Sequence, residues 1–113
     1  MDAIRATALL DELDRAVERR LRHLTEDAAS LRLDRADATA DDEHDPEGST
    51  LSGEWAHVDA LAREAGVERA EIRAARERVA AGVYGVCEVC GGPIADARLE
   101  ARPTARRCIA CAL

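Results

Sequence analysis

The chain has 113 residues and a mass of 12.2 kDa, which limits it to one small domain or to one long element with a small module. It contains no Phe, one Trp and one Tyr, so a core built from aromatic side chains is excluded. Its net charge of -7 argues against non-specific binding to nucleic acid or membranes, because phosphate contacts need an excess of Lys or Arg. Ala occurs 24 times and charged residues make up 35% of the sequence, as is typical of long or coiled-coil helices.

The first predicted helix covers residues 2–38, which contain neither Gly nor Pro. Leu10, Val17, Leu24 and Leu31 are seven residues apart, and the spacing of the whole apolar row averages 3.5 residues. The pattern therefore predicts a coiled-coil seam. The other members of the row are Leu13, Leu21 and Ala28.

A second helix is predicted from about Thr50 to Ala81, with Gly82 placed to end it. Its seam also repeats every seven residues and continues in a companion row. The members of the two rows are Leu51, Val58, Ala65, Ile72 and Val79, and Trp55, Leu61, Ala62 and Ala75. We interpret Gly66, inside this helix, as a point where the partner helix approaches closely.

Between the helices, Pro46 and Gly48 are expected to break the helical path within residues 40–49. Two helices joined by a short break predict an antiparallel hairpin, here residues 1–82 with its tip around 40–49. The stretch 34–47 carries seven acidic residues and one Arg, a net charge of -6, whereas the remaining residues sum to -1. The acidic tip indicates a basic protein surface or a metal ion as partner, or else a solvated turn.

The last segment, residues 83–113, holds four cysteines in the pattern C-x2-C-x17-C-x2-C: Cys87, Cys90, Cys108 and Cys111. Two such pairs match tetrahedral zinc, and we expect one structural ion because four thiolates leave no open coordination position. Free or disulfide-bonded cysteines are the alternative. No apolar leader precedes the first helix, which favours the cytoplasm. The closed metal site, with no nucleophile beside a base, predicts a protein that is not an enzyme.

The stretch Tyr84-Gly-x-Cys-x-x-Cys-Gly-x-x-Ile94, then Arg98-Leu-Glu-Ala-Arg-Pro-Thr-Ala105 and the second Cys pair, resembles the zinc finger of the DksA/TraR family. The resemblance implies a bacterial transcription regulator that binds RNA polymerase directly and inserts its coiled-coil tip into the secondary channel. It implies no sequence-specific DNA binding, and we expect a monomer. The chain ends two residues after Cys111, so we expect a short member without the C-terminal helix of longer relatives, and we assign no nucleotide site.

The tip of this family carries Asp-x-x-Asp-x-Ala, and Asp45-Pro46 matches its start, whereas Gly48 and Thr50 occupy the later positions. Asp45 is therefore the first candidate for the polymerase-contact tip. The further candidates are Asp42, Glu43 and Glu47. The mainly helical fold with its C-terminal four-Cys module also allows a zinc-stabilised helical adaptor for another protein. A DNA-binding finger would have to use Arg98, Arg102, Arg106 and Arg107.

Overall fold

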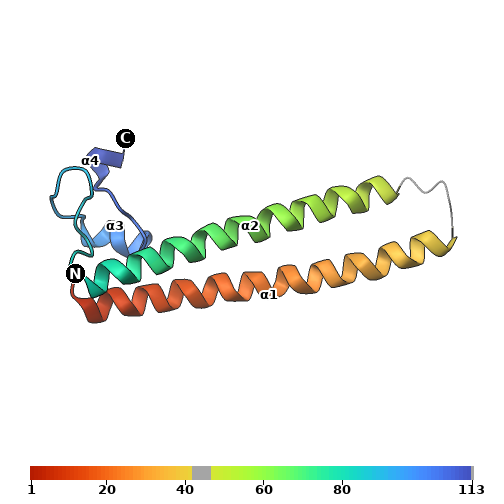
Figure 1. Ribbon diagram of the computed structural model, residues 1–113, viewed down its shortest axis with the longest axis horizontal. Coiled ribbons are helices and arrows are strands. Elements are labelled where there is room, and N and C mark those ends of the chain that lie inside the picture. Colours follow the sequence, from red (N-terminus) through yellow and green to blue (C-terminus); the bar gives the residue numbers. More distant parts are fainter. Residues whose placement is uncertain (42–46, 113) are drawn as a thin grey trace. The chain divides into compact units, whose positions relative to one another are not determined.

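The computed structural model describes residues 1–41 and 47–112, and these residues are mainly helical, as predicted. Two long helices are followed by two short ones (Figure 1). The helices are α1 (Ala3–Asp41), α2 (Glu47–Ala80), α3 (Asp96–Ala101) and α4 (Ile109–Ala112). An isolated antiparallel bridge joins Val86 to Pro93 between α2 and α3.

The ends of the long helices follow from local chemistry. Asp2 caps α1, because the backbone N–H of Arg5 donates to its Oδ1 at 2.7 Å. Helix α2 ends as predicted at Gly82, which has a φ of 75°. The N–H groups of Gly82 and Val83 donate to the carbonyls of Val79 (3.1 Å) and Arg78 (2.9 Å), the two bonds of a Schellman motif.

The predicted start of the second helix near Thr50 is wrong by one turn, because α2 begins at Glu47 and includes Gly48. Gly48 stands in the first turn of α2, outside the helix interior in which Gly costs about 1 kcal/mol relative to Ala. Of the two residues expected to break the helix, Gly48 is thus helical and Pro46 lies outside the described residues.

The chain forms two compact units. Unit 1 combines Met1–Ala16 with Glu68–Leu113, and unit 2 is Val17–Val67. In each unit, a segment of α1 packs antiparallel against a segment of α2 (Figure 1).

The helix pair of unit 1 has a closed seam. Ala6, Leu10, Ile72 and Ala75 are at most 1% exposed. Beside this seam, α1 and α2 are joined by three ion pairs, which link Arg76 to Asp11 (2.8 Å) and Asp14 (3.6 Å) and Arg69 to Asp14 (3.9 Å). These pairs match opposite charges across the seam and so favour this register of the two helices.

The seam of unit 2 is less closed. Val17, Leu31 and Ala65 are buried, but the other described seam residues are half-buried. The interpretation of Gly66 is wrong: it is exposed, and a Cβ added to it would meet nothing within 4 Å. Among the described residues, no helix has both the length and the apolar character that a membrane span requires.

Candidate metal centre

The four cysteines of the C-terminal segment converge on one point. The sulfurs of Cys87, Cys90, Cys108 and Cys111 all lie within 4.8 Å of one another. Sulfurs placed 2.3 Å from a central zinc in a tetrahedron are about 3.8 Å apart, and the Cys90 and Cys108 sulfurs are separated by 3.8 Å. All four cysteines are free, and this separation is far longer than a disulfide bond of about 2.05 Å. The donor set therefore fits the structural zinc of a C4 finger.

The first Cys pair sits on a tight turn that needs glycine. Gly91 has a φ of 72°, and its N–H donates to the carbonyl of Cys87 at 3.0 Å. The N–H of Gly92 lies 3.4 Å from the Cys90 sulfur, while the Cys87 N–H donates to the Gly92 carbonyl at 2.8 Å. The turn thus holds both sulfurs on the same side of the chain.

Hydrogen bonds shift the pKa values of two of the cysteines in opposite directions. The pKa of Cys87 falls to about 6, since backbone N–H groups of Cys90 and Cys108 donate to its sulfur. The pKa of Cys111 rises to about 12, because its thiol donates to the sulfurs of Cys108 and Cys87. Zinc binding would convert the remaining thiols to thiolates, because the thiolate form of cysteine is the metal ligand.

The run Arg98–Ala105 builds a small core beneath the cysteines. Leu99 is 1% exposed, and Pro103 is buried, with its carbonyl accepting a hydrogen bond from the Tyr84 hydroxyl at 2.7 Å. The buried core residues are Cys87, Ile94, Leu99 and Ala105. This core has few members, so the module depends on an additional source of stability.

The module rests on the ends of both long helices within unit 1. Met1 packs against the small core, and Arg5 of α1 pairs with Glu100 of α3 at 3.5 Å. On the other helix, the Nε of Arg106 donates to the Oε2 of Glu71 at 2.9 Å. Side chains before α1, on α1 and on α2 thus hold the same small module.

Three of the four arginines that a DNA-binding finger would have to use are engaged inside the protein. Arg106 contacts Glu71 and Glu88, Arg107 contacts Glu88, and the Nε of Arg98 donates to the carbonyl of Arg107 at 2.9 Å. The sequence allowed DNA, polymerase or the helix ends as partners of these arginines, but it did not single out Glu71, which lies 35 residues from Arg106. A DNA backbone would have to compete with these carboxylates.

The candidate tip residues Asp42, Glu43 and Asp45 lie outside the described residues, as does the side chain of Glu47. They remain predictions from the sequence.

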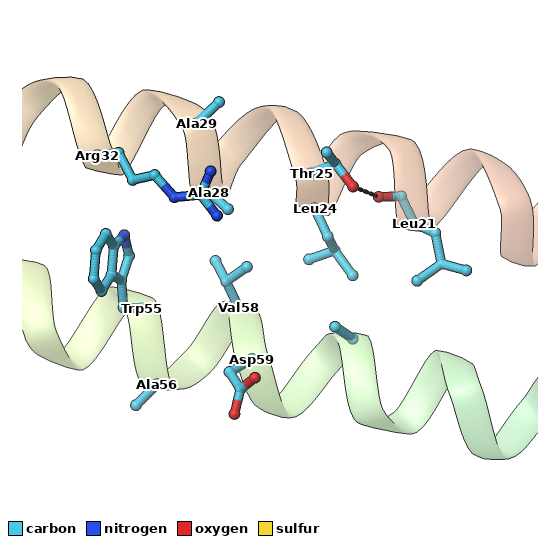
Figure 2. Close-up of a pocket in the computed structure, with 11 residues that line it drawn as sticks. Leu21, Leu24, Thr25, Ala28, Ala29, Arg32, Trp55, Ala56, Val58 and Asp59 are labelled. Carbon is cyan, nitrogen blue, oxygen red and sulfur yellow. Dashed lines mark hydrogen bonds between the residues drawn. The ribbon is translucent and has the colours of Figure 1, made fainter.

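A groove of about 600 Å³ lies between α1 and α2 in unit 2. Figure 2 shows Leu24 and Arg32 of α1 and Trp55 and Val58 of α2 pointing into the space between the helices. The seam residues Ala28 and Ala62 line this groove, and their small side chains fill little of it. Ala29 and Ala56 also line it, but both are exposed and point away from the facing helix (Figure 2). The sequence predicted Trp55 in the seam but gave no sign that the seam would stay open beside it.

Comparisons with known proteins agree with this geometry. Residues 82–113 match the family described as the prokaryotic dksA/traR C4-type zinc finger. The solved structure of transcription factor DksA2 from Pseudomonas aeruginosa is similar over 93% of this chain and 81% of that chain, with 25% sequence identity and a TM-score of 0.57. Comparison with curated proteins gives no significant match. Residues 82–113, the four-cysteine module, thus form a zinc finger of the DksA/TraR C4 type.

Proposed function

We propose that this protein is a bacterial transcription regulator that binds RNA polymerase directly and places the turn between α1 and α2 in the secondary channel. The main support is the similarity to the transcription factor DksA2, which extends over 93% of the chain and so includes the long helices as well as the finger. The protein acts by binding and is not an enzyme. Cys87, Cys90, Cys108 and Cys111 hold one structural zinc.

The charge distribution supports this use of the helices. Residues 17–67 carry 13 acidic residues and six arginines, whereas the rest of the chain carries ten of each. The whole net charge of -7 therefore belongs to unit 2, which contains the turn. An acidic segment is attracted to basic channel walls or to the surroundings of a catalytic magnesium ion.

The zinc module has a different role in this proposal. Its arginines are mostly paired with the protein's own acidic and carbonyl groups, which supports binding to polymerase without sequence-specific DNA contacts. We further propose a monomer in the cytoplasm, divided as residues 1–82 for the hairpin and 83–113 for the finger.

A photo-crosslinking residue at position 45 tests where the turn binds. With bacterial RNA polymerase, we expect crosslinks to subunits that line the secondary channel, and excess unmodified protein should compete for them. Crosslinks only to outer surfaces of the polymerase, or no complex in a pull-down, would show that the proposal is wrong.

Asp45→Ala tests what the tip does after binding. We expect most of the effect on a sensitive promoter to be lost, while affinity for polymerase changes by about fivefold at most, because one exposed ion pair contributes about 1 kcal/mol or less. Glu64→Ala, the same kind of change at an exposed site on α2, is the control and should retain the effect. Unchanged promoter response in Asp45→Ala would remove the tip from the mechanism.

A second candidate function is a helical adaptor for another protein, and the groove of unit 2 favours it. The apolar space beside Trp55 and Val58 resembles the surfaces on which partner helices dock. The crosslinking experiment separates the two candidates, because the adaptor requires no contact inside the polymerase channel.

A further inference from the structure

Arg106 lies between two carboxylates that belong to different parts of unit 1. Its Nε donates to the Oε2 of Glu71 on α2 at 2.9 Å, and its Nη1 lies 3.9 Å from the Oε2 of Glu88. Glu88 is inside the first Cys-x-x-Cys loop, and Arg106 stands two residues before Cys108. One guanidinium therefore connects the metal-binding loops to a long helix.

The position of Arg106 depends on both Cys loops being in place together. The backbone N–H of Glu88 donates to the carbonyl of Arg106 at 2.9 Å, which joins the two loops directly. Arg107 adds a second link, because its Nε lies 3.4 Å from the Oε1 of Glu88. Such loops do not assemble in a C4 site without metal, so the guanidinium is held beside Glu71 only in the assembled module.

We propose that Arg106 and Glu71 are positioning residues of the zinc site, which couple retention of zinc to docking of the finger on α2. The coupling is reciprocal. If the contact between Arg106 and Glu71 forms only in the metal-bound geometry, it raises the affinity for zinc by the same factor by which zinc favours docking of the finger on α2. Glu71 is 35 residues from Arg106 in the sequence, so no local motif discloses the pair.

The expected loss of zinc affinity depends on how far the side chains of the ion pairs are exposed to water. The side chains of Glu71, Arg106 and Glu88 are 40%, 39% and 45% exposed, so water screens part of their attraction. Partners outside the ligands typically change metal affinity by about 10- to 100-fold. With this screening, we expect a loss of zinc affinity of about threefold to tenfold.

The first measurement is the rate of zinc transfer from the full-length protein to a chromogenic chelator. Glu71→Gln and Arg106→Gln should each release zinc about threefold to tenfold faster, and the double variant should be no faster than the faster single variant. The matched controls are Glu77→Gln and Arg102→Gln, which remove the same charges from exposed side chains. Release from Glu71→Gln at the rate of Glu77→Gln would overturn the proposal.

Thermal unfolding of the same variants separates coupling from simple stabilisation. Coupling predicts that Glu71→Gln lowers the melting temperature of the zinc-loaded protein but leaves that of the chelator-treated protein unchanged. An ion pair that only stabilises the helices would lower both melting temperatures equally, and that result would also overturn the proposal. Neither measurement involves polymerase, so both are independent of the proposed function.

Discussion

Replacing Cys87 and Cys108 together by serine is expected to abolish zinc binding and to unfold the C-terminal module. One ligand is lost from each Cys pair, and Cys87 is also a core residue that is 2% exposed. Structural zinc supplies roughly 10–16 kcal/mol in zinc-finger peptides, whereas a module of this size buries too little apolar surface to fold alone.

Metal analysis should fall from one zinc per chain to none in this double variant. Hydrogen exchange in residues 84–112 should become fast, while most of the helical circular dichroism signal from unit 2 persists. Chelation of zinc from the unmodified protein should reproduce the same exchange pattern and so serves as the control. Retained protection of residues 84–112 in the double variant would contradict a structural zinc.

Leu99→Ala is expected to be the most damaging single change among the core residues of the module that are not cysteines. Leu99 is 1% exposed, and its Cδ1 lies 3.3 Å from the position that a Cβ on Gly85 would occupy. A Leu→Ala change in a closed core costs about 2–5 kcal/mol, because it removes buried methyl groups and leaves a cavity.

The lower free energy of unfolding of the Leu99→Ala variant should appear in urea unfolding of the zinc-loaded protein at a fixed concentration of free zinc. Leu33→Ala is the matched control, because Leu33 is 69% exposed on α1 and should change the free energy of unfolding by about 0.5 kcal/mol or less. If the two variants unfold at the same urea concentration, Leu99 is not a support of the metal module.

Features set by short stretches of sequence were predictable. The seven-residue spacing of Leu10 and Val17 predicted a seam, and both side chains are fully buried. Gly82 predicted the end of α2, because the left-handed backbone of a Schellman motif favours glycine. The Cys spacing predicted the cluster, since two residues between ligands let both sulfurs reach one ion.

Features that depend on three-dimensional neighbours were not predictable. The heptad pattern counts Ala28 and Ala62 as seam residues but carries no information on the gap that their small side chains leave. The basic character of Arg106 was evident, yet its partner Glu71 is one of many acidic residues on the predicted helices. Gly66 was assigned a packing role because Gly is costly within a helix, but its surroundings are open.

Unit 1 is assembled from both ends of the chain, and this arrangement sets the order in which the protein can fold during synthesis. Unit 2 is contiguous, so its helices can pair as soon as residues 17–67 have emerged. The contact between Arg5 and Glu100 spans 95 residues and must wait until residue 100 has been made. Zinc capture and closure of the helix ends therefore come last, and a nascent chain presents its acidic hairpin before its metal module exists.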